Sequence, residues 1–443
     1  MLLRLILPLL LTLLQSTTAR PFTNISDLRH RPTGWHNEGW TGPITLSDDS
    51  NETFFEDDFG DLHSTRLLKR DDDGDELAKR ARGPTTLKQK TPRPEMKFLS
   101  QPPGGTDLNS LEYFAYLSTA GTGVTVYVHD SGLNQGHKWF NEKVDGVERG
   151  KVKIIQPQKD ANGRKVPAIN GDSDGHGTCV ADKVVGSIHG IAKGVNLKMV
   201  PQVDRDDDEF MLAELQLIVD DIKKKKKEAG KFWNKGKSFW AVVNLSYVFG
   251  TNIENNKDTL DRYRKKYKAM VDEGALLVAG AGNAGNYVVD SYPAMFAGEA
   301  AFKDSMIVAG AVNTKGEIAS FSQTGKLVEA WAPGVFDEGN HGPSEYQGIK
   351  CADKTQNGAT QRWGTSLAVP QVVGLAAYLY STDSALQGDG AAQKVKKKIV
   401  NAKDDDRAAH QRIKGGAILH LESGVRQSLL ATPTPTHSPT RLV

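Results

Sequence analysis

Short apolar runs rich in β-branched residues recur between about residues 120 and 385 and predict buried strands. Stretches with helical spacing lie between them. Continuous apolar strands that alternate with helices form a parallel sheet that is covered on both faces. The pattern therefore predicts an α/β fold with a mainly parallel central sheet and helices on both faces. The clearest predicted strands are 124–130, 197–203, 241–245, 276–279 and 306–309.

Two predicted helices allow a second interpretation. Segment 206–227 begins with four acidic residues and ends with five lysines, charges that suit the two ends of a helix dipole. The lysine run could be a nucleic-acid patch, but a solvated helix end explains it better. Segment 363–380 has 18 residues without a charge, the nominal size of a membrane span. Because it contains Gly364 and Pro370, we interpret it as a helix buried in the domain core.

The N-terminal region differs in composition from the rest of the chain. Residues 1–19 combine a basic residue, a short apolar core and a small-residue end, which predicts a cleaved signal peptide rather than a signal anchor. Residues 20–95 are polar, with blocks of like charge, and bury little apolar surface. They predict a removed prosegment, with an unstructured tail carrying chance basic pairs as the alternative. This segment contains glycosylation sequons at Asn24 and Asn51 and basic processing sites at Arg70, Arg80 and Arg82.

The C-terminal residues 431–443 are rich in Thr and Pro and predict a flexible tail. Residues 96–430 then remain as one large domain. The chain has 56 Lys and Arg against 54 Asp and Glu, so no net basic field favours nucleic acid or anionic lipid. Its two cysteines, Cys179 and Cys351, exclude a disulfide-dense scaffold, a four-cysteine zinc site and an iron–sulfur cluster.

Polar residues with matching chemistry lie at the ends of several predicted elements. Asp130 ends a strand, His176 lies where a loop turns into a helix, and Ser366 begins the uncharged helix. Acyl transfer needs a nucleophilic hydroxyl, an imidazole base and a carboxylate that orients the imidazole. Asn283 follows another buried strand, where its amide could donate to an oxyanion. Each residue alone has a plain structural explanation, but together they indicate acyl transfer.

The motifs around these residues resemble those of the subtilisin-like serine peptidases, most closely the secreted proteinase K-like branch. The resemblance extends from about residue 122 to 379 and implies a subtilisin-like three-layer peptidase domain. It also implies that Asp130, His176 and Ser366 form a catalytic triad and that Asn283 completes an oxyanion hole. The matching motifs are 126–134 (VYVHDSGLN), 176–181 (HGTCVA) and 364–370 (GTSLAVP).

The same resemblance predicts the substrate-binding residues, and there the chain departs from the family. Segment 246–250 reads SYVFG where the family usually has Ser-Leu-Gly-Gly, so side chains at 248 and 249 should reshape the specificity pocket. Asp182 stands where the family has a small glycine, and a buried charge is costly unless it is paired. The implied substrate-binding residues are Ser246, Tyr247, Val248, Ala281 and Gly282.

The resemblance implies no cofactor for catalysis. A structural calcium ion is compatible with it, but we identify no metal site, since Trp139 stands where many members carry a calcium-binding Asp. Cys179 and Cys351 both approach the active centre in the family's topology, either as a disulfide or as a buried pair of free thiols. The expected protein is secreted and extracellular, a monomer that acts on polypeptides. It should bind no nucleic acid and have no stable membrane insertion after signal cleavage.

Two other classes of protein compete with the peptidase interpretation. Segment 280–285 matches the dinucleotide fingerprint G-x-G-x-x-G, but β-branched residues and Pro293 follow it instead of a helix. The stronger competitor is a pseudopeptidase that binds a peptide or a partner on the same fold. Asp182 and the altered segment 246–250 favour that alternative, whereas the intact site residues favour an active enzyme.

Overall fold

The computed structural model describes the predicted α/β region and a short stretch before it. The described residues are 84–90, 92–100, 113–230, 239–249, 253, 256–339, 342–401 and 417–418. The predicted signal peptide and C-terminal tail lie outside them, as do the sites Asn24, Asn51, Arg70, Arg80 and Arg82.

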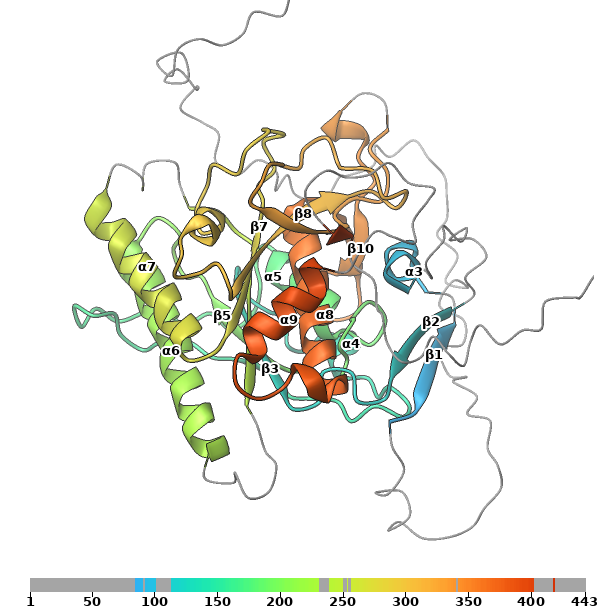
Figure 1. Ribbon diagram of the computed structural model, residues 1–443, viewed down its shortest axis with the longest axis horizontal. Coiled ribbons are helices and arrows are strands. Elements are labelled where there is room, and N and C mark those ends of the chain that lie inside the picture. The colour runs from blue at the N-terminus through green and yellow to red at the C-terminus, as the bar shows by residue number, and fades with distance from the viewer. Residues whose placement is uncertain are drawn as a thin grey trace, which may run out of the picture. The chain divides into compact units, whose positions relative to one another are not determined.

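Eight parallel strands form a central sheet within the described residues (Figure 1). Their order across the sheet is β12-β9-β8-β7-β6-β3-β5-β4, so β3 and β6 lie side by side near the middle. The strands are β3 (Val124–Asp130), β4 (Val152–Ile154), β5 (Asn196–Pro201), β6 (Trp240–Leu245), β7 (Leu276–Gly280), β8 (Met306–Val312), β9 (Val328–Pro333) and β12 (Ala417–Ile418).

Alternate residues of these strands enter two different cores, one on each face of the sheet. Val126 and Val242 pack in the core that includes α5 (His176–Val185), α8 (Thr365–Thr382) and α9 (Ala391–Val400). The other core includes α6 (Asp208–Gly230) and α7 (Lys257–Asp272), which lie together in Figure 1. This arrangement confirms the predicted α/β class with helices on both faces. The parallel direction of the strands places all their carboxyl ends at one edge.

The remaining elements are short and lie around this three-layer centre. They are β1 (Thr86–Lys90), α3 (Pro94–Ser100), β2 (Tyr113–Leu117), α4 (Lys138–Asn141), η7 (Ala294–Gly298), η8 (Pro343–Glu345), β10 (Ile349–Ala352), β11 (Ala359–Arg362) and η9 (Ser384–Leu386). Strand β1 lies within the segment expected to be the prosegment, and it pairs with β2 in an antiparallel ladder.

Helix α8 is the uncharged segment of the sequence, and its residues 365–380 are buried. It contacts β6, β7, β8 and β9 along one face of the sheet. Pro370 lies in its second turn and cannot donate to the Ser366 carbonyl four residues earlier. That carbonyl accepts instead from the Ser246 hydroxyl at 3.0 Å. Within the described part of the chain, no helix has the length and hydropathy that a membrane crossing requires.

Two charged residues on α5, the helix that begins at His176, are completely buried. Asp182, whose charge was expected to be costly, accepts hydrogen bonds from His189 Nδ1 at 2.7 Å and from the Ala352 backbone N–H at 2.9 Å. Burial opposes its ionisation, but His189 and nearby Lys183 bring the pKa of Asp182 below its ordinary value. The unpaired charge that the sequence suggested is therefore compensated.

Lys183 is also compensated, and its partner comes from the N-terminal part of the described chain. Its Nζ lies 2.7 Å from Oε1 of Glu95, and both side chains are buried. This ion pair joins α3 to the helix that carries His176. Removing one member of a buried pair leaves an uncompensated charge, whereas replacing both members by apolar groups is often neutral.

Lys183→Met should therefore lower the free energy of unfolding by about 3–5 kcal/mol, because Glu95 then stays buried without its cation. The double variant Glu95→Leu/Lys183→Met should recover most of that loss. Urea unfolding of the three proteins measures both effects. A single variant as stable as the wild type would show that the pair does not hold α3 against α5.

Candidate active site

Asp130, the last residue of β3, is completely buried and hydrogen-bonded. Its Oδ1 lies 2.7 Å from His176 Nδ1 and 2.7 Å from the Ser131 backbone N–H. Burial alone would raise the pKa of this carboxyl, but attraction to His176 and the two hydrogen bonds bring it below its ordinary value. Asp130 is therefore an ionised acceptor at neutral pH.

His176 is the first residue of α5 and is 1% exposed. Gly175 before it has a φ of 86°, a left-handed conformation that turns the loop into the helix. Burial lowers the pKa of His176 below its ordinary value of 6.5, although the charge of Asp130 opposes this. A neutral imidazole that donates Nδ1–H to Asp130 leaves the lone pair on Nε2. The ring is therefore prepared to accept a proton at Nε2.

Asp172 organises the loop before His176, and the sequence analysis did not single it out. Its carboxylate accepts four hydrogen bonds, two at Oδ1 and two at Oδ2. The donors are the Ser131 hydroxyl, the Gly175 backbone N–H, and the backbone N–H and hydroxyl of Thr178, at 2.7–2.9 Å. An acidic residue just before a helix start is a capping signal, and here it fixes the start of α5 beside β3.

Ser366 and Asn283 meet at the N-terminus of α8. Asn283 Oδ1 accepts from the Thr365 backbone N–H at 2.8 Å and from its hydroxyl at 2.9 Å. The amide nitrogen of Asn283 therefore lies on the side away from Thr365. Asn283 Nδ2 and Ser366 Oγ both lie 3.1 Å from the position that a Cβ would occupy at Gly364. That glycine has a φ of 138° and keeps the space between the hydroxyl and the amide clear.

The predicted substrate-binding residues Ser246 and Gly282 lie against this centre. Ser246 Oγ accepts from Asn244 Nδ2 at 2.9 Å and donates to the Ser366 carbonyl at 3.0 Å. Gly282 follows buried Ala281 and has a φ of 108°. A Cβ at Gly282 would lie 1.5 Å from Oε1 of Gln323, so the backbone requires glycine there.

The side chains of Tyr247 and Phe249 both turn into the core. Tyr247 is buried, and its hydroxyl lies 2.8 Å from His129 Nδ1 and 2.7 Å from the Tyr267 hydroxyl. The Phe249 ring packs in the same core, with its centroid 4.3 Å from that of Tyr263. The Phe249 side chain was expected to reshape the specificity pocket, but it packs in the core instead. Val248 between them is half-buried.

His129, the residue before Asp130, links that core to the loop after β5. Its Nε2 lies 2.8 Å from Oε2 of Glu214, and both side chains are completely buried. Oε1 of the same glutamate accepts from the Val203 backbone N–H at 2.9 Å. Burial raises the pKa of Glu214. This hydrogen-bonded chain connects Tyr247 on one side of Asp130 with Val203 on the other.

Cys179 and Cys351 form a disulfide whose Cα atoms are 5.0 Å apart. The bond joins α5 to β10 and packs with Ile349 and Leu367 in a small apolar cluster. Because Leu367 follows Ser366, the disulfide packs beside both α5, which carries His176, and α8, which carries Ser366.

Trp139, which the resemblance places where a calcium-binding Asp was expected, is buried against the rings of His137 and His189. Among the described residues, no group of three or more His, Cys, Asp or Glu side chains is arranged to hold a metal ion.

Comparisons with known proteins agree with this geometry. The subtilase family matches residues 121–417, about two thirds of the chain. The chain is 31% identical over 300 residues to subtilisin-like protease 2 of Trichophyton rubrum and 31% over 286 residues to subtilisin-like protease 7 of Arthroderma gypseum. The alignments cover 67% and 64% of this chain but only 59% and 56% of those relatives. The chain belongs to the subtilase family.

Solved structures with low sequence identity share the fold. A cold-adapted subtilisin-like serine proteinase aligns with a TM-score of 0.52 at 20% identity, over 74% of this chain and 98% of that one. The nisin leader peptidase from Lactococcus lactis aligns with a TM-score of 0.50 at 16% identity, over 74% and 91%.

Asp172→Asn should weaken both folding and activity, because an amide group cannot accept all four hydrogen bonds that the carboxylate accepts. We expect a loss of about 1–3 kcal/mol in the free energy of unfolding and a lower kcat/KM on a peptide substrate. Asp304→Asn is the matched control, since that residue is exposed in the turn before β8 and should tolerate the change. Equal effects of the two substitutions would contradict a special role for Asp172.

Proposed function

We propose that this protein is a secreted serine endopeptidase that hydrolyses polypeptides through Asp130, His176, Ser366 and Asn283. The observation that carries the proposal is the buried Asp130–His176 hydrogen bond of 2.7 Å, which leaves Nε2 of a neutral imidazole as the base. Family membership supports the reaction class. The clear space between Ser366 Oγ and Asn283 Nδ2 supports the position of the reacting carbonyl.

The reaction begins when Ser366 Oγ attacks the scissile carbonyl carbon and His176 Nε2 takes the hydroxyl proton. Asp130 holds the ring and stabilises the imidazolium that forms. The carbonyl oxygen becomes an oxyanion, which accepts from Asn283 Nδ2 and from backbone N–H at the start of α8. When the tetrahedral intermediate collapses, the C–N bond breaks and His176 gives its proton to the leaving amine. Water then cleaves the acyl-enzyme by the same steps, which regenerates Ser366.

The remaining parts of the chain complete the proposal. Residues 1–19 would direct secretion, and 20–95 would form the prosegment of a zymogen that is cut after Arg70, Arg80 or Arg82 and glycosylated at Asn24 and Asn51. Of these sites, Arg82 lies just before the first described strand, so cleavage there would retain β1 and Glu95 in the mature enzyme. Residues 96–430 would be the catalytic part and 431–443 a tail. We propose a monomer that needs no cofactor for catalysis.

Two observations support catalysis over the pseudopeptidase alternative. Asp182 is compensated by His189 and the Ala352 backbone, so it imposes no unpaired charge on the helix of His176. Tyr247 and Phe249 pack in the core and do not obstruct Ser366. We therefore propose catalysis rather than peptide binding alone.

A fluorophosphonate probe tests the nucleophile directly, since it forms a covalent bond only with an activated serine. The wild type should be labelled, and Ser366→Ala should lose labelling completely while it stays folded. Ser384→Ala, at an exposed serine that begins η9, is the matched control and should label like the wild type. Labelling that persists in Ser366→Ala would assign the nucleophile to another residue.

The pH profile of kcat/KM tests His176 as the base. A neutral imidazole is required, so activity falls as the pH drops through the pKa of His176. Because burial lowers that pKa, the acid limb should lie below pH 6.5. Stopped assays across pH 4–9 with a fluorogenic peptide measure the limb. An acid limb above pH 6.5 would mean that Asp130 outweighs burial, or that another group controls it.

A further inference from the structure

A buried chain of polar side chains passes through β3, one residue before the end of that strand. His129 connects the chain in both directions: its Nδ1 lies 2.8 Å from the Tyr247 hydroxyl, and its Nε2 lies 2.8 Å from Oε2 of Glu214. The chain continues from Tyr247 to the Tyr267 hydroxyl at 2.7 Å, and from Glu214 to the Val203 backbone N–H at 2.9 Å. His129, Glu214 and Tyr267 are completely buried, and Tyr247 is 6% exposed. The members of the chain therefore bind one another rather than bulk solvent.

The chain is complete in both directions. A carboxylate only accepts hydrogen bonds, whereas a hydroxyl and a neutral imidazole each donate and accept. Whichever of His129 and Glu214 holds their shared proton, the Tyr247 hydroxyl has a donor on one side and an acceptor on the other. Complete buried networks fix the geometry of their members, whereas apolar side chains of similar size tolerate small shifts. The chain therefore holds Tyr247 in one position.

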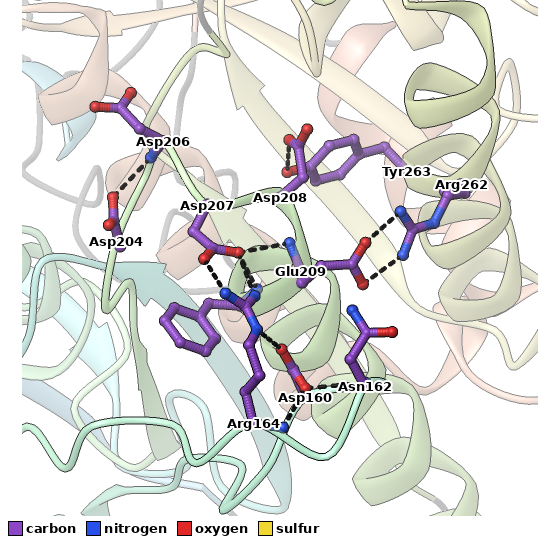
Figure 2. Close-up of polar contacts among 11 residues, drawn as sticks. Asp160, Asn162, Arg164, Asp204, Asp206, Asp207, Asp208, Glu209, Arg262 and Tyr263 are labelled. Carbon is purple, nitrogen blue, oxygen red and sulfur yellow. Dashed lines mark hydrogen bonds and ion pairs between the residues drawn. The ribbon is translucent and has the colours of Figure 1, made fainter.

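The helices at the two ends of this chain are fixed against each other. Glu214 belongs to α6, and Tyr267 belongs to α7. Figure 2 shows one contact between the two helices, in which Arg262 of α7 forms paired hydrogen bonds of 2.6 Å to Glu209 of α6. The chain is thus anchored on rigid elements, as precise positioning requires.

Tyr247 lies within segment 246–249, which the family resemblance assigns to substrate binding. The two ends of the segment have contacts of their own. Ser246 donates to a carbonyl of α8 at 3.0 Å, and the Phe249 backbone N–H donates to a carbonyl of the loop before η7 at 2.8 Å. Val248 is half-buried, whereas the side chains of Tyr247 and Phe249 on either side of it pack in the core. The contacts of the Tyr247 hydroxyl therefore help to determine where Val248 lies.

The position of Asp130 does not depend on this chain. Its backbone carbonyl accepts from the Gln202 N–H at 2.7 Å, and β3 pairs with β5 on one side and β6 on the other. Its carboxylate is held by His176 and by the Ser131 backbone N–H. Breaking the chain should therefore change the binding of an extended substrate more than the reactivity of Ser366.

We propose that His129 is a positioning residue that acts through Tyr247 on segment 246–249 and thereby sets the affinity of the site for extended peptides. This inference rests on the proposed peptidase function, because it places a substrate along that segment. A small acylating or phosphonylating compound that reaches only the nucleophile should react equally well with or without the chain. A peptide that extends along the segment should bind more weakly when the chain is broken.

The first test breaks the chain at the Tyr247 hydroxyl. Tyr247→Phe keeps the ring in the core, so the protein should stay folded. We expect the KM for a fluorogenic hexapeptide to rise roughly three- to tenfold, the equivalent of one hydrogen bond, whereas kcat and the rate of labelling by a small fluorophosphonate should change less than about twofold. Tyr127→Phe is the matched control and should leave all three unchanged. That buried tyrosine of β3 donates its hydroxyl to Asp221 of α6 at 2.6 Å, outside the chain.

The second test asks whether His129 acts through Tyr247. In His129→Gln, the side-chain amide can replace Nε2 beside Glu214, but no atom replaces Nδ1. This variant should therefore raise KM as much as Tyr247→Phe does. The double variant should raise KM no further, because both substitutions remove the same contact.

The outcomes separate this inference from the proposed function. An unchanged KM in Tyr247→Phe, an equal rise in Tyr127→Phe, or additive effects of His129→Gln and Tyr247→Phe would each overturn the inference. If the fluorophosphonate does not label the wild type, the proposed function fails, and dissociation constants of the same hexapeptide, measured by fluorescence anisotropy, take the place of KM. Weaker binding by both chain variants would then still support the positioning role, and equal binding by all the proteins would overturn it.

Discussion

Helix α8 is buried along most of its length, and this burial decides where polar chemistry can lie in the protein. Packed against β6 to β9, the helix can expose polar groups only at its ends. Its N-terminus reaches the edge where the parallel strands end, so Ser366 meets Asn283 there. The first turn of the helix also brings backbone N–H groups to that edge, where the N–H of Thr365 binds Asn283. Apolar packing in the centre thus concentrates hydrogen-bond donors at one place.

Three side chains at this edge are positioned by specific hydrogen bonds. Asp130 holds His176, Thr365 holds Asn283, and Asp172 holds the loop between them. In a water-poor site these hydrogen bonds are stronger, and each also fixes an orientation that the side chain alone would not keep.

The sequence predicted the central sheet with its two helical layers, and the sheet edge where polar residues gather, because both follow from local patterns. A buried parallel strand must be apolar throughout, and a polar residue at its end, such as Asp130, stands out. The direction of a side chain in irregular backbone depends instead on partners distant in sequence. Tyr247 turns inward because His129, 118 residues earlier, and Tyr267 bind its hydroxyl. The free-energy cost of burying Asp182 could not be judged from the sequence, because only the fold brings its partners His189 and Ala352 next to it.

Contacts of the N-terminal part of the described chain determine how late during synthesis this domain can complete its folding. Lys183, which neutralises Glu95, is made 88 residues after it. The backbone N–H of Gly121 binds the hydroxyl of Ser381, which follows 260 residues later at the end of α8. At about 5–20 residues per second, the ribosome needs roughly 13–50 s to supply that partner. Throughout this interval the apolar face that α8 will cover stays open, so the nascent chain must be protected from aggregation until its last large helix emerges.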